Sequence, residues 1–244
     1  DWSSDVCSSD LLVASLMTAA APWIAVLFLF EVAILATDTL GFRAIVGADD
    51  SRAVPARVWI RSTGWAYLCF ALVPAGRIAC EVARAAVFAP FLGAPRAARS
   101  GAVLQAAALL ADGAISFFVA VVLVVHVGRV DALSGFIFVN TLVAGGSGFA
   151  LHRAFKSPRV ARWLANRLPS VVPAKDALPT NERADAAPPP IAGALAWSVF
   201  GRFLQVAQYG VAVHAVGGAL TFVTSCIAHG IHMAGVTVGT AIPA

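Results

Sequence analysis

Three charged side chains, Arg77, Glu81 and Arg84, stand close together inside an otherwise apolar stretch of the chain. On a helix, spacings of four and three residues place all three on one face. One carboxylate between two guanidinium groups leaves a net positive charge, which suits a phosphate gripped by arginine. Pro74 and Gly76 loosen the helix just before these charges and free backbone N–H groups for the same anion. The pattern predicts an anion site, and the structural alternative is a salt bridge that fixes two helices together.

A second charge, Arg202, lies near the middle of another apolar run, with Gln205 and Tyr209 on the same helical face. Such a polar stripe can line a path for a lipid head group. It can equally be a buried contact between helices in which Arg202 pairs with Asp112, because that pair would satisfy both charges. Both interpretations stay open at the level of the sequence.

Other side chains with ligand chemistry carry weaker signals. Cys226, His229 and His232 recur every three residues along one side of a helix, but one helix offers no carboxylate or fourth ligand for a soft metal. We therefore expect a packing role for them and predict no metal site and no cofactor. Glu31 is the one charge in its apolar run, and nothing near it in the sequence identifies a partner.

Motifs of known catalytic sites are missing from the sequence. There is no nucleophile elbow, phosphate-binding loop, zinc-protease motif or dinucleotide fingerprint. No aromatic and basic motif of a nucleic-acid-binding module is present either. We therefore expect a protein that is not an enzyme and that has no nucleic-acid partner.

The composition indicates that membrane spans position these charges. Hydrophobic residues make up 59% of the 244 residues and charged residues only 12%, and the mean hydropathy is +0.82. A soluble domain carries about 25% charged residues. The shortage falls in separate runs, as in a polytopic bundle of transmembrane helices and not in one soluble core. The predicted fold class is therefore all-α.

The apolar runs give the predicted spans and the polar segment between the first two. The expected spans are 12–36, 101–127, 132–151, 191–217 and 219–244, and residues 38–61 are expected to form a polar loop or a surface helix. Within one span, Gly145, Gly146 and Gly148 favour close contact with a neighbouring helix, because small residues let helix backbones approach.

Residues 64–93 are apolar at both ends and charged in the middle, which fits either one kinked span or a re-entrant helical hairpin. Basic residues fill the loop at 152–190 and also precede the 64–93 segment. Re-entry places every basic loop on the cytoplasmic side, as the positive-inside rule requires. We therefore predict a re-entrant hairpin at 64–93.

Residues 1–11 look like the translation of a sequencing adapter, and we expect them to be foreign to the protein. The remaining residues, 12–244, form the predicted transmembrane domain. We expect this domain to be truncated at both ends.

Three segments resemble the transmembrane domain of the lysylphosphatidylglycerol synthase family, which consists of flippase-like integral membrane proteins. They are the Pro-Gly-charged segment 74–84, the segment 109–112 that ends in an aspartate, and the C-terminal segment 239–244. The similarity extends over residues 40–244. Cys80 departs from the pattern, because the family usually has a glycine before the glutamate.

The resemblance implies a lipid translocase of the bacterial cytoplasmic (inner) membrane, which moves phospholipid or polyprenyl-linked lipid between leaflets. Its partners would be membrane lipids, together with a soluble biosynthetic enzyme or a second copy of the chain. In this hypothesis Arg77, Glu81 and Arg84 engage the lipid head group. Arg202 and Gln205 lie opposite them. The alternative is a non-transporting membrane scaffold for a lipid or glycan biosynthetic enzyme, in which the charges are structural.

Overall fold

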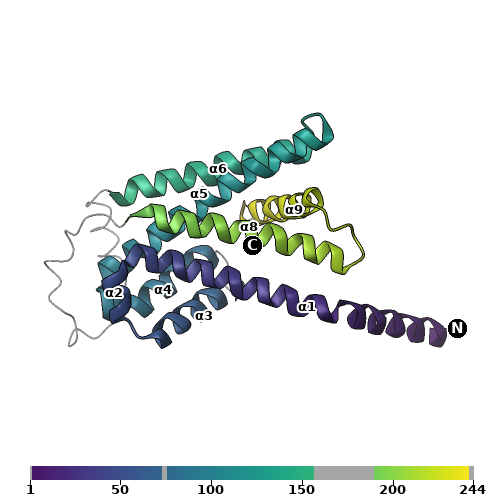
Figure 1. The fold of residues 1–244 in the computed structure, drawn as a ribbon, viewed down its shortest axis with the longest axis horizontal. Helices are drawn as coiled ribbons and strands as arrows, with labels where there is room; N and C mark the ends of the chain where they lie inside the picture. Colours follow the sequence, from purple (N-terminus) through teal and green to yellow (C-terminus); the bar gives the residue numbers. More distant parts are fainter. Residues whose placement is uncertain (1, 73–75, 157–189, 242–244) are drawn as a thin grey trace.

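The structure, a computed structural model, describes residues 2–72, 76–156 and 190–241 (Figure 1). All regular elements in these ranges are α-helices, which confirms the predicted all-α fold. The helices are α1 (Trp2–Val46), α2 (Ala48–Ala53), α3 (Ala56–Leu72), α4 (Gly76–Leu92), α5 (Ala94–Val127), α6 (Ala132–Lys156), α8 (Ile191–Ala215) and α9 (Phe222–Ala241).

Among the described residues, three helical segments are long and apolar enough to cross a bilayer: Pro22–Val46 of α1, all of α5 and all of α6. A 25-residue helix is about 37 Å long, compared with about 30 Å of hydrocarbon in a bilayer. The chain thus has the helices of an integral membrane protein. α8 also has 25 residues. It is helical where a span was predicted, although it is not among the three segments.

α1 runs past residue 36, where its span was predicted to end, and finishes at Val46. Phe42, Ile45 and Val46 are each at most 3% exposed, so their apolar side chains pack into the bundle and extend the helix. The prediction of a polar loop or surface helix was therefore wrong for residues 38–46. As a consequence Asp38 belongs to a helix of the bundle and not to a loop.

α3 and α4 pack against each other as a helical hairpin. Their outer ends, Ala56 and Leu92, both lie at the end of the bundle where α1 finishes and α5 begins (Figure 1). Each helix has 17 residues, which is about 25 Å and less than the hydrocarbon thickness. The structure confirms the hairpin predicted at 64–93, with an earlier start at Ala56. Pro74 lies outside the described residues.

Basic residues gather at the same end of the bundle. α1 and α6 finish there, and α2, α3 and α5 begin there (Figure 1). The residues at these helix ends are Arg43, Arg52, Arg57, Arg61, Arg96, Arg99, Arg153 and Lys156. This grouping is the one that the predicted orientation requires. Residues 157–189 of the predicted basic loop lie outside the described residues.

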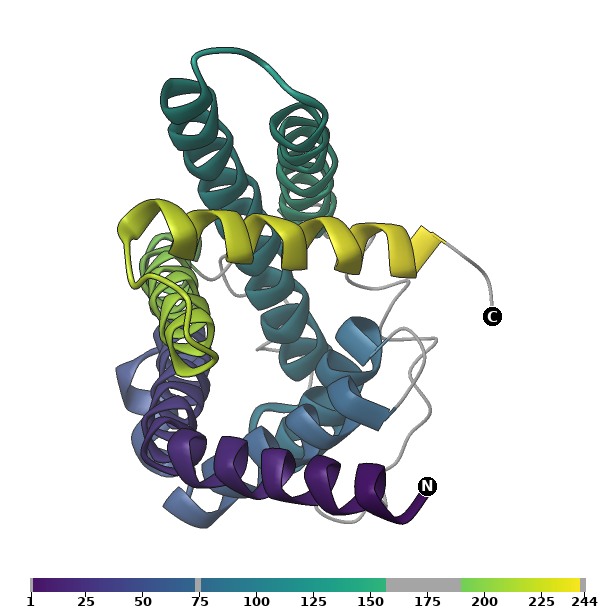
Figure 2. The ribbon, with the colours of Figure 1, turned by 90° about the vertical axis from the view of Figure 1, so that its right-hand side faces the viewer.

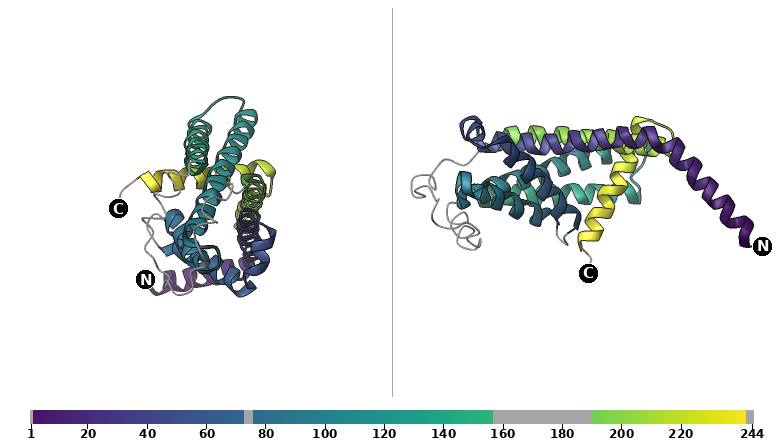
Figure 3. Two further views of the ribbon diagram at one scale, coloured as in Figure 1. Left: turned by 90° about the vertical axis from the view of Figure 1, so that its left-hand side faces the viewer. Right: turned by 90° about the horizontal axis from the view of Figure 1, so that it is seen from below.

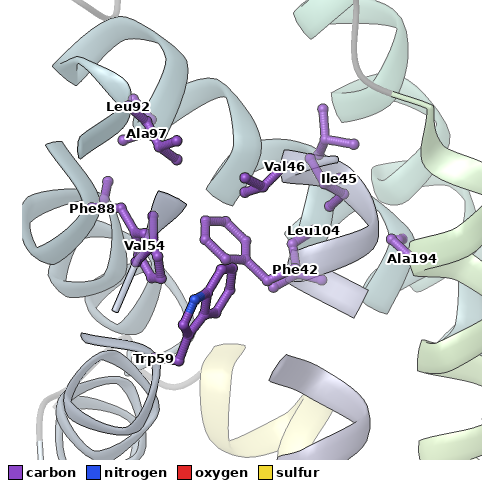
Figure 4. Packing of buried hydrophobic residues seen from close by; sticks show 14 residues of the cluster. Phe42, Ile45, Val46, Val54, Trp59, Phe88, Leu92, Ala97, Leu104 and Ala194 are labelled. Atoms are coloured by element: carbon purple, nitrogen blue, oxygen red, sulfur yellow. The ribbon is translucent and has the colours of Figure 1, made fainter. Parts of the chain in front are cut away.

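An aromatic cluster, Phe42, Trp59 and Phe88, joins the hairpin to α1 (Figure 4). The ring centroid of Phe88 lies 4.9 Å from that of Phe42 and 4.7 Å from that of Trp59, and the Phe42 and Trp59 centroids are 6.0 Å apart. Aromatic pairs at such distances contribute beyond their buried area. The cluster therefore fixes the position of α3 and α4 against the end of α1.

The rest of the bundle consists of two pairs of helices that lie side by side and of one helix that crosses them. α1 lies beside α8, and α5 lies beside α6 (Figures 1 and 3). α9 runs across these helices and not along them (Figures 2 and 3). A Cβ atom on Gly113 of α5 would lie 2.8 Å from the Cα of Gly145, and one on Gly148 would lie 2.8 Å from the backbone nitrogen of Leu110. This confirms the close helix contact predicted for Gly145 and Gly148, whereas a Cβ atom on Gly146 would meet nothing within 4 Å, so the prediction was wrong for Gly146.

Candidate functional site

A cavity of about 190 Å³, which we call the charged cavity, lies between α1, α3, α4, α5 and α8. Four of the five residues predicted to bind substrate line it: Glu81 and Arg84 from α4, and Arg202 and Gln205 from α8. The fifth, Arg77, lies in the first turn of α4, and its side chain is outside the described part of the structure. The fold thus places the two predicted groups of residues, from distant parts of the sequence, around one space. The other polar lining residues are Glu31, Thr37, Asp38, Thr63, Tyr67, Cys80, Gln105 and Ser198.

Arg84 lies at the centre of the ionic contacts on the α4 side. Its guanidinium forms an ion pair with Asp38 of α1, and its Nε lies 3.9 Å from Oε2 of Glu81, one helical turn earlier. The same guanidinium lies 5.3 Å from the ring centroid of Phe42, a cation–π distance. Because only 5% of the Arg84 side chain is exposed, its charge is compensated inside the bundle and not by water.

Asp38 changes the charge balance predicted from the sequence. The prediction set two arginines against one glutamate. Among the described side chains, Arg84 instead faces two carboxylates, Asp38 and Glu81. Asp38 is a carboxylate that the prediction did not include, and the side chain of Arg77, which the predicted surplus of positive charge needs, lies outside the described part of the structure. The described lining of the charged cavity contains three carboxylates and two guanidinium groups. They belong to Glu31, Asp38, Glu81, Arg84 and Arg202.

Arg202 forms an ion pair with Asp112 of α5, and its Nη1 donates a hydrogen bond of 2.6 Å to Oε1 of Gln205. Asp112 is only 1% exposed. The sequence left two interpretations of Arg202 open, a wall of a lipid path and a buried ion pair. The structure shows the ion pair with Asp112, and Arg202 also lines the charged cavity. The interpretation as a wall of a lipid path stays a prediction.

Glu31 finds its partner on α8, far away in the sequence. Nε2 of Gln208 donates a hydrogen bond of 3.0 Å to Oε2 of Glu31, and it lies 3.4 Å from the carbonyl oxygen of Leu27. Glu31 also lines the charged cavity. The sequence signalled that a lone glutamate in an apolar run needs a partner, but its spacing could not identify a residue on another helix.

The histidines of α9 pack beside α8. His229 is 1% exposed, and the Tyr209 ring centroid lies 5.6 Å from that of His229 and 4.9 Å from that of His232. Cys226 is fully buried in an apolar cluster. In the part of the chain that the structure describes, no three histidine, cysteine, aspartate or glutamate side chains come together as a metal ion would require.

Comparisons of the chain with family models, with curated proteins and with solved structures found no match. The similarity to the lysylphosphatidylglycerol synthase family therefore stays a prediction from the sequence motifs.

Proposed function

We propose that this integral membrane protein is a lipid translocase of the flippase-like type. The observation that carries the proposal is the charged cavity, which is lined in part by α1 and α5, two helices long and apolar enough to cross a bilayer. Ionised groups at membrane depth are costly and usually serve a substrate path. A lipid head group that crosses hydrocarbon needs polar partners in place of water, and this lining offers them.

The size of the charged cavity favours a head group over a whole lipid. Its volume of about 190 Å³ is below the range of about 300–1,000 Å³ in which proteins enclose drug-sized ligands. The hydrocarbon chains of the lipid would therefore stay outside the cavity. A site that takes only the head group suits movement between leaflets better than storage of a complete lipid.

The lining can receive both charges of a head group. Arg84 and Arg202 can each bind phosphate oxygens through paired N–H donors. Glu31, Asp38 and Glu81 can accept hydrogen bonds from an ammonium or hydroxyl group. Because both arginines already contact carboxylates, phosphate binding would exchange one anionic partner for another without leaving an unpaired cation.

A second candidate function is a membrane scaffold for a lipid or glycan biosynthetic enzyme. The same ion pairs favour it, because Arg84 with Asp38 and Arg202 with Asp112 each join two helices. In a scaffold these pairs are permanent, and no lipid takes their place. The two candidates differ in whether the protein moves lipid at all.

The test is lipid movement in vesicles that contain the purified chain. Fluorescent phosphatidylglycerol and a fluorescent polyprenyl phosphate are placed in both leaflets, and a membrane-impermeant quencher reports the rate at which inner-leaflet lipid reaches the outside. We expect the chain to accelerate exchange of one of these lipids over protein-free vesicles. We expect Glu81→Gln to slow it by about 10–100-fold, since a hydrogen bond to a charged group is worth about 1.5–3 kcal/mol.

The matched control is Arg52→Gln. Arg52 forms an ion pair with Asp49 on α2, and their side chains are 79% and 101% exposed. This variant should move lipid at the rate of the unaltered chain, because an exposed pair contributes little. If the unaltered chain moves neither lipid, with or without a pH gradient, the translocase proposal is wrong and the scaffold replaces it.

A further inference from the structure

A second space, which we call the α1–α3 groove, lies beside the charged cavity. Its volume is about 410 Å³. It is lined by Val32, Leu35, Ala36 and Thr39 of α1 and by Trp59, Ile60, Thr63, Gly64 and Tyr67 of α3. The polar side-chain groups in this lining are three hydroxyls and the indole N–H of Trp59, so its chemistry contrasts with the ionised lining of the charged cavity.

The hydroxyls near the centre of the α1–α3 groove are satisfied within the protein. Oγ1 of Thr39 lies 2.8 Å from Oγ1 of Thr63, across the two helices. Oγ1 of Thr39 also lies 2.9 Å from the carbonyl oxygen of Leu35, and Oγ1 of Thr63 lies 3.1 Å from that of Trp59. Because two hydroxyls supply two hydrogens, two of these three contacts are hydrogen bonds at one time, and each hydroxyl takes part in at least one of them. An apolar occupant of the groove would therefore leave neither hydroxyl without a partner.

The α1–α3 groove and the charged cavity are neighbours that share part of their lining. Leu35, Thr63 and Tyr67 line both spaces. On its other side the groove reaches the surface of the bundle, where Ile60 is 74% exposed and Val32 is 47% exposed. Val32 belongs to the apolar segment of α1 that is long and apolar enough to cross a bilayer. An apolar groove at the surface of the bundle thus adjoins an ionic cavity.

We propose that the α1–α3 groove binds a hydrocarbon chain of the lipid whose head group enters the charged cavity. This inference rests on the proposed function, and it adds where the substrate lies and from which side it enters. The amphiphilic order of the two spaces matches that of a lipid, with an apolar part outside and a charged part inside. The lipid enters from the membrane between α1 and α3.

Gly64 allows the α1–α3 groove to be filled without distorting the helices. A Cβ atom on Gly64 would meet nothing within 4 Å, and Gly64 lines the groove. The variant Gly64→Trp therefore places an indole in the path of the chain. Gly146→Trp is the matched control, because Gly146 of α6 is also helical, exposed and free of neighbours within 4 Å of a Cβ atom, and it does not line the groove.

The experiment uses the full chain in vesicles with phosphatidylglycerol that carries a diazirine in its acyl chain. After illumination, mass spectrometry compares the labelling of residues 32–39 and 59–67 with that of Leu142, Val143 and Phe149, the large exposed apolar side chains on this part of α6. We expect labelling to be about tenfold higher in the α1–α3 groove and to saturate with unlabelled lipid. We expect Gly64→Trp to remove this excess and Gly146→Trp to keep it.

The labelling and the transport assay separate the two proposals. Equal labelling of the groove and of α6, or an excess that survives Gly64→Trp, overturns the groove as a chain site even where the chain moves lipid. A saturable excess that Gly64→Trp removes supports the groove. Lack of lipid movement by the unaltered chain overturns the proposed function, and the labelling result is read independently of it.

Discussion

The charged cavity and the α5–α6 seam lie on different faces of α5 and are built in opposite ways. We define the seam by Gly113 and Ser116 of α5 and by Asn140, Gly145 and Gly148 of α6. In the seam, the glycines bring the two backbones so close that an added Cβ atom would lie 2.8 Å from the opposite helix. A hydrogen bond of 2.8 Å crosses the seam, from Nδ2 of Asn140 to Oγ of Ser116.

Around the charged cavity, long side chains hold the helices apart. Arg84 joins α4 to α1 through Asp38, and Arg202 joins α8 to α5 through Asp112. The guanidinium and the carboxylate of an ion pair lie between two helices and keep their backbones apart. Glycines, in contrast, let two backbones come into contact. Because lipid tails give no hydrophobic drive for helix association, packing and polar contacts must hold both regions together.

The two regions show how one bundle can be tightly packed between some of its helices and enclose a cavity between others. Backbone contact through glycines fixes α5 and α6 and leaves no space between them. Ion pairs fix α1, α4 and α8 and keep a polar space open. We therefore predict that the helix contacts around the charged cavity depend on ion pairs and that those of the seam depend on close packing. The variants below test this prediction.

The largest effect is expected for Arg202→Met. This variant removes the cation next to Asp112, which is 1% exposed. Breaking a buried ion pair by removing one partner costs about 3–5 kcal/mol. Tryptophan fluorescence during denaturation in detergent should show this loss of unfolding free energy.

The double variant Arg202→Met/Asp112→Leu is the control for that experiment. It should recover most of the lost stability, since replacing both partners by apolar groups is often neutral. If Arg202→Met is as stable as the unaltered chain, charge does not hold α8 against α5. The contrast between the cavity side and the seam would then disappear.

The next effect is expected in the seam, for Gly113→Ala. A methyl group here would lie 2.8 Å from the Cα and the backbone nitrogen of Gly145, so α5 and α6 must move apart. Overpacking of this kind costs about 1–3 kcal/mol. The same denaturation measurement applies. Gly146→Ala, whose Cβ atom would meet nothing within 4 Å, should leave stability unchanged, and equal stability of the two variants would contradict a seam built on shape.

A smaller effect is expected for Asn140→Leu, which removes the hydrogen bond across the seam. Ser116 is 1% exposed and would lose this partner. Hydrogen bonds between transmembrane helices contribute about 0.6 kcal/mol on average and about 1.7 kcal/mol at most. A loss larger than that of Gly113→Ala would show that polar contact and not shape dominates the seam.

Local patterns in the sequence predicted the parts of the fold that depend on local residues. Apolar runs gave α5 and α6, Gly145 and Gly148 gave the close contact, and the charged stretch gave the helical hairpin. The same runs placed the end of α1 too early. Phe42, Ile45 and Val46 are too few to form an apolar run, and only their burial against other helices reveals that α1 continues.

Prediction of the charged cavity from the sequence has the same limit, because contacts between distant helices leave no local pattern. The sequence identified Glu81, Arg84, Arg202 and Gln205 because a charge or amide in an apolar run is conspicuous. It assigned Asp38 to a polar loop or a surface helix, although this residue pairs with Arg84 from 46 positions away. Charge patterns indicate that a partner is needed, whereas the partner's identity depends on how helices meet.

The smallest effect concerns the turn before α6, where a local contact sets the start of one side of the seam. Asp131 precedes α6, and its Oδ1 accepts a hydrogen bond of 2.8 Å from the backbone N–H of Ser134. The Ser134 hydroxyl oxygen in turn accepts a hydrogen bond of 2.9 Å from the backbone N–H of Asp131. This reciprocal pair caps the helix, as a capping box does.

The hydrogen bond from the Ser134 backbone lowers the pKa of Asp131, and the contact with the Ser134 side chain lowers it further. A carboxylate with a lowered pKa in the folded state stabilises the helix start fully above the ordinary aspartate pKa of about 3.9. That contribution falls as the pH drops through the lowered pKa. The protection of the amides at 132–135 against hydrogen exchange, measured relative to the intrinsic exchange rate at each pH, should therefore fall in this acidic window. Asp131→Asn should remove the pH dependence and keep the cap, and Asp131→Ala should accelerate exchange at neutral pH as well. An unchanged rate in Asp131→Ala would mean that the seam, and not the cap, fixes where α6 begins.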